Sequence, residues 1–374
     1  MNILPQPVLG ILTLYLNDRK QLEERKIYER MTQEGHRIGL KVIVFTPSDV
    51  NAEKNMIQAM VFDPVQGKWS RSWRPFPDMI FDRCRIQRSK RFEQLRVFRR
   101  RYGHLHFLNK PLRDKWTIYQ VLSRRPEFKN YLPDTAYFGS LSDVYAMLKR
   151  NNRIYIKPIQ GTGGRGILCV EKLGSQMYRI QGRNRQRAIV PPQKLHLSRM
   201  GPYLLNWKKG TSFLVQEGID IMLPNGRVHD YRMLVQKNGS GVWSVTGCAG
   251  RIGPARSVTS NLHGGGHAAE MNTLLRKWIH AEQKVFEVRA EAEKVGLGIA
   301  SYLDGFYGPL CELALDLAID RSGRIYVLEV NPKPAREVFA RSGDKEAYRN
   351  AILKPLEYAL WSYRQKAKKT DPSD

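Results

Sequence analysis

The feature that most constrains this chain is a lysine followed by a glycine-rich segment in residues 154–167. The apolar residues 154–156 predict a strand that carries Lys157, and four glycines follow within six residues. Glycines adopt positive φ and let backbone N–H groups point toward one spot, where a lysine adds a mobile positive charge. The segment therefore predicts either a phosphate-binding loop or an ordinary glycine-rich hairpin beside a lysine. The glycines are Gly161, Gly163, Gly164 and Gly166.

Two familiar nucleotide-binding loops do not fit this segment. In a P-loop the lysine follows the last glycine and precedes Ser or Thr, whereas Lys157 comes before the glycines. The glycine spacing also matches G-x-G-x-x-G, but a Rossmann site needs an acidic residue about 20 positions later. No Asp or Glu occurs between Glu171 and Glu217, so the dinucleotide interpretation fails.

A second group of candidate site residues lies far downstream, in two apolar runs that predict a hairpin over residues 313–330. Asp316 stands in the middle of the first run, Glu329 ends the second, and Asn331 follows at a proline. Carboxylates in such runs are costly to bury unless they are paired or bound to a cation. Three oxygen donors on adjacent strands match the preference of Mg²⁺ for hard oxygen ligands. The alternative is an edge strand whose acids face water.

Composition places the chain among globular proteins. Its 374 residues suggest two or three domains, and 42% hydrophobic with 10% aromatic residues exclude a disordered chain. No apolar run approaches the roughly 18 residues that span a bilayer, and the first residues lack the positive charge of a secretory signal. Cysteines without C-x-x-C spacing predict reduced thiols and a cytoplasmic protein: Cys84, Cys169, Cys248 and Cys311.

The net charge of +27 predicts attraction to polyanions. Residues 83–101 hold nine Lys or Arg against Glu93 alone, and residues 172–209 hold nine without any acid. No nucleic-acid-binding motif accompanies the charge, and aromatic residues are not interleaved with it. Solvated basic faces are therefore favoured over a dedicated nucleic-acid site.

The order of expected elements predicts a mixed α/β protein. Strands at 8–16 and 41–46 around a helix at 20–34 predict a small α/β unit with parallel pairing, which ends near residue 109. Further helices are expected at 115–122, 142–149, 193–207, 271–296 and 347–366.

From residue 109 to residue 331 these motifs, in this order, resemble the ATP-grasp superfamily. The resemblance implies an α/β (α+β) fold in which two subdomains grip a nucleotide behind an N-terminal Rossmann-like preATP-grasp domain. It implies an N-terminal domain at 1–109, a subdomain with the glycine flap at 110–212, a subdomain with the metal-binding hairpin at 213–366 and a polar tail at 367–374.

The resemblance also implies roles for individual residues. Lys115 and Lys157 would be the two nucleotide lysines, and the glycines of 161–166 the flap over the phosphates. Residues 215–219 resemble the hinge that meets adenine, although Gly218 stands where an aromatic residue is common and Asp220 is a weak candidate for the ribose. The implied adenine contacts are Gln216, Glu217 and Ile219, and the implied Mg²⁺ ligands are Asp316, Glu329 and Asn331.

Four residues resemble the catalytic groups of RimK-type ligases. Arg251 would neutralise phosphate charge, and Asn261 with His263 would orient the acyl group. His263 is equally consistent with capping its own loop. Arg232, in an Asp-x-Arg motif, either faces the substrate or pairs with Asp230.

The subgroup that the chain resembles is the YheC/YheD family of endospore coat-associated proteins, on the strength of residues 77–83, residues 132–135 and the basic composition. This implies ATP and Mg²⁺ as cofactors and an ATP-dependent carboxylate–amine ligase that works through an acyl phosphate. An anionic peptide or polymer would be the substrate, and spore-coat proteins the partners, in the cytoplasm or the coat of the developing endospore. A kinase on the same fold, or a structural coat protein without turnover, remains open.

Overall fold

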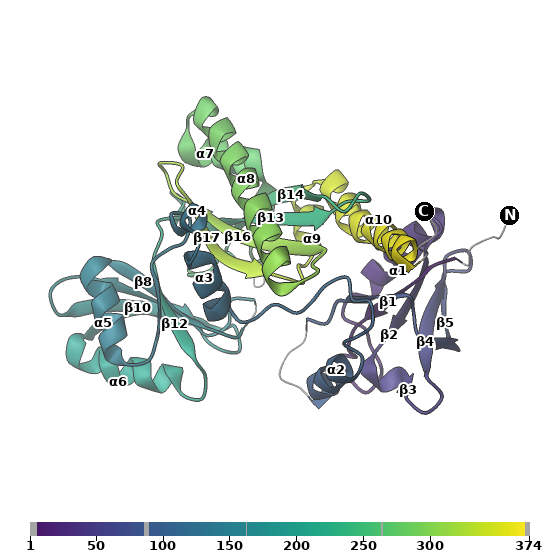
Figure 1. Ribbon diagram of the computed structural model, residues 1–374. Coiled ribbons are helices and arrows are strands. Elements are labelled where there is room, and N and C mark those ends of the chain that lie inside the picture. Colours follow the sequence, from purple (N-terminus) through teal and green to yellow (C-terminus); the bar gives the residue numbers. More distant parts are fainter. Residues whose placement is uncertain (1–5, 86–89, 162, 263–264, 371–374) are drawn as a thin grey trace.

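The computed structural model describes residues 6–85, 90–161, 163–262 and 265–370, whose strands form three sheets. Each sheet defines one lobe of the molecule (Figure 1). We call them the N-terminal lobe (β1–β6), the flap lobe (β7–β12) and the hairpin lobe (β13–β17). Among the described residues, no helix combines the length and apolar character that crossing a bilayer requires.

The N-terminal lobe has a parallel centre with an antiparallel extension. Its strands follow the order β3-β4-β2-β1-β6, with β5 paired to β4, and β1 runs parallel to both β2 and β6. The central strands are almost entirely buried, as expected for parallel strands covered on both faces. The elements are β1 (Val8–Leu12), α1 (Arg25–Arg37), β2 (Lys41–Phe45), η1 (Pro47–Asp49), β3 (Val50–Asn51), β4 (Met56–Asp63), β5 (Lys68–Pro75), β6 (Met79–Asp82) and α2 (Lys90–Arg101).

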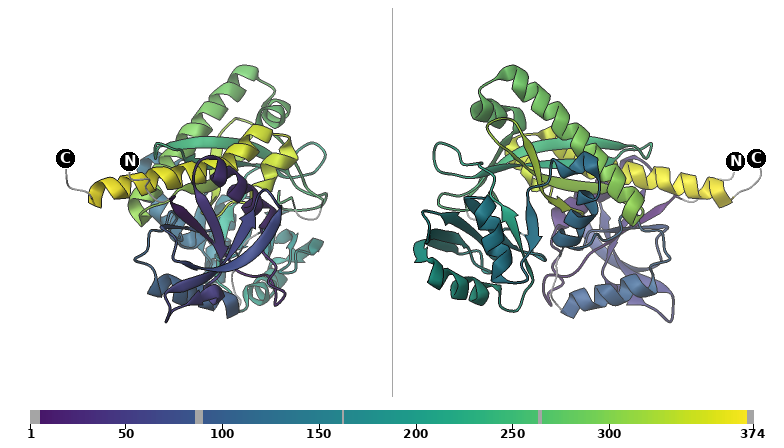
Figure 2. Two further views of the ribbon diagram at one scale, coloured as in Figure 1. Left: turned by 90° about the vertical axis from the view of Figure 1, so that its right-hand side faces the viewer. Right: turned by 60° about the vertical axis from the view of Figure 1, so that its left-hand side comes forward.

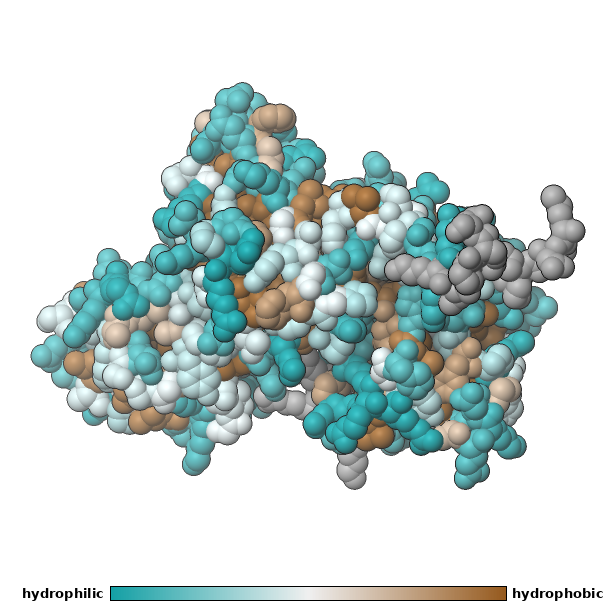
Figure 3. All heavy atoms as spheres, viewed as in Figure 1, coloured by the Kyte–Doolittle hydropathy of each residue, from teal (hydrophilic) through white to brown (hydrophobic). Residues whose placement is uncertain are grey.

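The basic helix α2 is a solvated face. It buries Leu95 and Phe98 against the N-terminal sheet and exposes Arg96, Arg100 and Arg101. Figure 3 shows hydrophilic residues gathered over this helix.

The flap lobe is a sheet in the order β11-β10-β9-β8-β12-β7, covered by α5 and α6. β12 belongs to this sheet because it pairs with both β8 and β7. The expected boundary at residue 213 therefore falls one strand too early. The elements are α3 (Lys115–Ser123), α4 (Pro126–Lys129), β7 (Thr135–Tyr137), α5 (Leu141–Arg150), β8 (Arg153–Pro158), β9 (Ile167–Lys172), β10 (Met177–Arg183), β11 (Ile189–His196), α6 (Leu197–Lys208) and β12 (Phe213–Glu217).

The hairpin lobe is a sheet in the order β15-β14-β13-β16-β17. α3, α4, α7 and α8 share one core with it, and α9 and the start of α10 share another. Every residue of β16 is buried, which explains the apolar run around Asp316. The elements are β13 (His229–Lys237), β14 (Trp243–Ile252), β15 (His267–Glu270), α7 (Met271–Ile279), α8 (Glu282–Tyr307), β16 (Glu312–Ile319), β17 (Ile325–Asn331), α9 (Glu337–Ser342) and α10 (Lys345–Thr370).

The last helix, α10, ties the hairpin lobe to the N-terminal lobe. Ile352, Leu356 and Ala359 lie in the same core as Leu9 and Tyr28 of the N-terminal lobe. Figures 1 and 2 show α10 running across this lobe beside α1. Elements near the beginning and near the end of the sequence therefore share one core.

A buried charge cluster lies at the same junction. Arg83, which follows β6, donates to Glu24, to Glu312 on β16 and to the Pro334 carbonyl, and its side chain is fully buried. Glu312 also accepts from Arg336 at 2.7 Å. The Arg83–Glu312 pair joins the N-terminal lobe to the hairpin lobe, so separating the lobes would break a buried ion pair, and this pair fixes their relative position.

Several expected elements differ from the observed ones, among them the first strand, which ends at Leu12, and the first helix, which begins at Arg25. The helix expected from residue 193 begins at Leu197, because residues 189–196 form β11 and the His196 ring accepts from the Ser198 N–H at the helix start. The helix expected at 271–296 is two helices, interrupted at His280 with φ of 60°. The tail expected from residue 367 is helical to Thr370, and residues 371–374 lie outside the described part.

We predict that Glu312→Gln lowers the free energy of unfolding by about 3–5 kcal/mol, because it removes the carboxylate that pairs with the buried Arg336 and leaves the buried Arg83 with Glu24 as its remaining carboxylate partner among the described residues. Urea denaturation followed by tryptophan fluorescence measures the change. Glu287→Gln on the exposed face of α8 is the control and should stay within about 0.5 kcal/mol. Equal denaturation midpoints for the two variants would contradict this role.

Candidate active site

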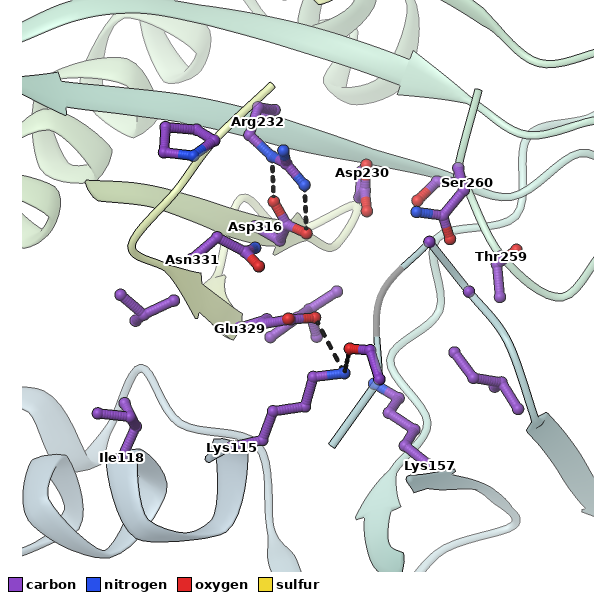
Figure 4. A pocket seen from close by; sticks show the side chains of 18 of the residues that line it. Lys115, Ile118, Lys157, Asp230, Arg232, Thr259, Ser260, Asp316, Glu329 and Asn331 are labelled. Carbon is purple, nitrogen blue, oxygen red and sulfur yellow. Dashed lines mark hydrogen bonds and ion pairs between the residues drawn. The ribbon is translucent and has the colours of Figure 1, made fainter. Parts of the chain in front are cut away.

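A cavity of about 940 Å³ opens between the lobes and is lined by residues from all of them. Lys157 and Glu329, which lie far apart in the sequence, both face it. The close-up in Figure 4 shows side chains of the flap lobe pointing toward those of the hairpin lobe. The cavity therefore brings together the two groups of candidate site residues identified in the sequence.

Two lysines enter the cavity from neighbouring elements. Lys115 opens α3, which Asp114 caps by accepting from the Thr117 N–H at 3.0 Å. The Lys115 ammonium donates to the Gly161 carbonyl at 3.1 Å and lies 3.4 Å from a Glu329 oxygen. Lys157 on β8 donates to the side-chain oxygen of Gln216 on the adjacent β12.

Charged groups from both lobes influence the pKa of Lys157. Burial and the neighbouring Lys115 ammonium lower the pKa of Lys157 to about 8. The carboxylates of Glu329, Asp230 and Asp316 act in the other direction and raise this pKa. An ammonium that titrates near neutral pH, inside a cavity with another cation, is suited to binding an added anion.

The glycine segment joins β8 to β9 and has the expected backbone. Gly163, Gly164 and Gly166 have φ of 68°, 73° and 69°, whereas Gly161 does not require positive φ. A Cβ atom on Gly164 would lie 2.4 Å from the Asn261 side-chain oxygen of the hairpin lobe. Only glycine at position 164 therefore lets the flap approach the hairpin lobe this closely.

Asp316 is held between two guanidinium groups. Arg232 donates to both of its oxygens, and a terminal nitrogen of Arg251 lies 3.0 Å away. Arg251 also pairs with Asp230, so the pairing of Arg232 with Asp230 considered from the sequence is wrong. Burial alone would raise the pKa of Asp316, but Arg232 and Arg251 lower it to about 2.

The three predicted metal ligands share one side of the hairpin. Glu329 is the register partner of Asp316, and Asn331 lies two residues further along the same strand face. β17 is an edge strand, yet Glu329 faces the cavity rather than water alone. Figure 4 shows the three side chains around one space.

The donor set fits a hard cation. Two carboxylates and an amide supply oxygen atoms. Oδ2 of Asp316 is contacted by both guanidinium groups, whereas Oδ1, which among the described residues accepts from Arg232, keeps a second lone pair for a cation. Among the described residues no group of three or more His, Cys, Asp or Glu could hold a metal, so Asn331 is needed to complete this set.

The expected hinge lines the cavity, but its side chains have partners already. Gln216 donates to the Thr135 hydroxyl at 3.0 Å, and the Glu217 carboxylate accepts from the Asp134 N–H at 3.0 Å. Gly218 donates to the Arg153 carbonyl at 2.9 Å, and a Cβ there would lie 2.7 Å from the Arg153 side chain. This contact explains why an aromatic residue is absent at that position.

Some of the other predicted site residues line the cavity and others do not. Asn261 and Ile219 line the cavity, and His263 lies outside the described residues. Asp220 is 3.7 Å from Arg153 and does not line the cavity within the described chain, which removes the basis for a ribose role. Lys333 and Arg187 also line the cavity, and no sequence motif marked either of them.

The lobes, the flap and the hairpin together define an ATP-grasp protein. Residues 104–361 match the family model described as YheC/D like ATP-grasp, and the chain belongs to that family. It is 26% identical over 365 residues to the endospore coat-associated protein YheC of Bacillus subtilis, covering 95% of this chain and 98% of that protein. It is 22% identical to YheD of the same organism, covering 95% of this chain and 78% of that protein.

Solved structures share the fold at low identity. The D-cycloserine synthetase DcsG aligns with a TM-score of 0.56 at 14% identity, covering 95% of this chain and 99% of that one. D-alanyl-alanine synthetase A from Vibrio cholerae aligns with a TM-score of 0.55 at 11% identity, covering 97% and 98%. These likenesses establish the ATP-grasp fold.

We predict that two substitutions shift the pKa of Lys157 in opposite directions. Glu329→Gln removes a negative charge that favours the ammonium, so the pKa falls below about 8, whereas Lys115→Met removes a competing positive charge and the pKa rises. Since only the neutral amine reacts, pulse labelling with acetic anhydride across pH 6–11, read by mass spectrometry of the Lys157 peptide, reports both midpoints. Identical midpoints in the two variants would show that these groups do not share a cavity.

Proposed function

We propose that this protein is an ATP- and Mg²⁺-dependent carboxylate–amine ligase. The observation that carries the proposal is the convergence of Lys115 and Lys157 on the Asp316–Glu329–Asn331 set within one cavity. Two cations beside an oxygen-rich cation site match the charges of a metal-bound triphosphate. Membership of the ATP-grasp family supports the same conclusion.

Each group has a separate task in binding. Lys115 and Lys157 bind phosphate oxygens, and the N–H groups of the flap cover the phosphate chain. Asp316, Glu329 and Asn331 would hold Mg²⁺, which neutralises phosphate charge when bound. Arg232 and Arg251 keep Asp316 ionised and oriented, and so act on the reaction through its carboxylate. Adenine lies against the backbone of 216–219, since the hinge side chains have other partners.

The proposed reaction has two steps. A carboxylate oxygen of the first substrate attacks the γ-phosphorus of ATP, and the bond to the bridging oxygen breaks with its electron pair leaving on ADP. The nitrogen of the amine substrate then attacks the carbonyl carbon of the acyl phosphate, inorganic phosphate leaves, and the nitrogen loses a proton to solvent. No side-chain nucleophile is needed, so positioning and charge neutralisation supply the rate. Asn261 orients the acyl group beside the flap.

The substrate class follows from charge. With a net charge of +27, the protein attracts an anionic acceptor such as an acidic peptide or polymer. Likeness over nearly the whole chain to two endospore coat-associated proteins supports action in the developing endospore, with coat proteins as partners.

We predict that Glu329→Gln weakens ATP binding about tenfold or more in the presence of Mg²⁺ and changes it little in EDTA, because it removes a metal ligand. Isothermal titration calorimetry measures both affinities. Glu293→Gln, which alters an exposed pair on α8, is the matched control and should bind ATP as the unsubstituted protein does. Unchanged Mg²⁺-dependent affinity in Glu329→Gln would contradict the metal assignment.

The acyl phosphate is testable without knowing the natural amine. Hydroxylamine intercepts acyl phosphates as hydroxamates, so we expect a ferric-hydroxamate signal and ADP release only when ATP, Mg²⁺ and a suitable carboxylate are all present. A panel of amino acids, acidic dipeptides and acidic oligopeptides supplies the carboxylate. Phosphate transfer to a hydroxyl compound would indicate a kinase, and nucleotide binding without turnover on the whole panel would favour a structural coat protein.

A further inference from the structure

Arg187 is a cavity-lining cation that neither the sequence motifs nor the proposed roles account for. It belongs to the basic segment 172–209, which contains no acid, and lies in the turn between β10 and β11. Its side chain nevertheless lines the same cavity as Lys157 and Glu329, whereas the neighbouring Arg185 is exposed and lies outside the set of described lining residues.

The turn holds Arg187 in an unusual backbone conformation. Its φ is 70°, in the left-handed region that residues other than glycine rarely adopt. The Asn184 carbonyl accepts from the Arg187 N–H at 3.0 Å, and the Arg183 side chain donates to the Arg187 carbonyl at 3.2 Å. Asn184 also accepts from the Gly166 N–H at 3.1 Å, which ties this turn directly to the flap. Strain of this kind persists where the surrounding structure fixes a side chain for use.

The guanidinium group rests on the flap itself. A Cβ atom on Gly163 would lie 2.6 Å from a terminal nitrogen of Arg187, so this glycine makes room for the guanidinium. The Nε of Arg187 is buried and has no hydrogen-bond partner among the described residues. Burial and the nearby Arg165 and Arg183 lower the pKa of Arg187, and no carboxylate offsets them in the described part of the chain.

The position of the flap tip indicates which anion completes this site. Gly164, next to the residue that supports Arg187, packs against Thr259 and Asn261 of the hairpin lobe. The tip therefore reaches from the flap lobe to the lobe that carries Asp316 and Glu329. An anion held there is the terminal phosphoryl group rather than the adenine end of a nucleotide.

We propose that Arg187 binds the γ-phosphoryl group of ATP and holds it as it is transferred to the carboxylate. The proposal rests on the proposed ATP-dependent function and adds a third cation to the two lysines. A guanidinium donates two parallel hydrogen bonds to phosphate oxygens, which a lysine cannot do. Its charge is most useful where negative charge develops during transfer.

The test compares two nucleotides that differ in the terminal phosphate. We expect Arg187→Ala to weaken binding of the non-hydrolysable Mg²⁺–AMP-PNP by roughly ten- to a hundredfold, the usual loss for hydrogen bonds to a charged group, while Mg²⁺–ADP affinity changes by less than about threefold. Arg187→Lys should recover part of the loss. Arg185→Ala removes an exposed arginine from the same turn, one that donates to the Lys209 carbonyl at 2.6 Å, and should leave both affinities unchanged.

Calorimetry on the full chain measures these affinities, and circular dichroism checks that each variant is folded. Unchanged AMP-PNP affinity in folded Arg187→Ala, or an equal loss for ADP and AMP-PNP, would overturn the role of Arg187 while leaving the nucleotide site intact. Failure of the unsubstituted protein to bind either nucleotide would overturn the proposed function, and the role of Arg187 with it.

Discussion

The alternation of acids and guanidinium groups around Asp316 is the interaction on which the rest of the site depends. Asp230, Arg251, Asp316 and Arg232 lie on three adjacent strands and pair in sequence, largely hidden from water. Removing one member would leave an uncompensated charge in a buried sheet. The arrangement keeps Asp316 ionised while the charges of the four groups cancel, so the carboxylate that faces Lys115 across the cavity is that of Glu329.

The cavity also depends on how the lobes are joined. The cluster of Arg83, Glu24, Glu312 and Arg336 fixes the N-terminal lobe against the hairpin lobe, and α10 packs across both. The flap lobe is joined differently, through α3, α4 and the close contact of Gly164 with Asn261. The N-terminal and hairpin lobes are thus fixed to each other, and the flap lobe contributes Lys157 and the glycine segment to the cavity.

Sequence patterns located the features whose cause is local. Glycines after an apolar strand indicated the glycine segment that lines the cavity, and carboxylates inside apolar runs indicated the candidate cation site, because a buried carboxylate needs a partner. Features set by tertiary contacts had no such signal. The break at His280 lies inside a continuous amphipathic pattern, and the membership of β12 in the flap sheet is decided by strand pairing. The sequence does not distinguish Arg187 from its basic neighbours, because its position beside Gly163 is set by the turn between β10 and β11.

The pairing of Lys115 with Glu329 links the two halves of the proposed function. These groups lie 3.4 Å apart, although we propose that Lys115 binds phosphate and that Glu329 binds the metal. A cation bound at Glu329 competes with the Lys115 ammonium for the same carboxylate, which releases the lysine toward phosphate. An added phosphate in turn offsets the repulsion between Lys115 and Lys157 that lowers the pKa of Lys157. Under the proposed function, metal and nucleotide would therefore assist each other's binding, because each would neutralise charges that otherwise pair or repel within the cavity.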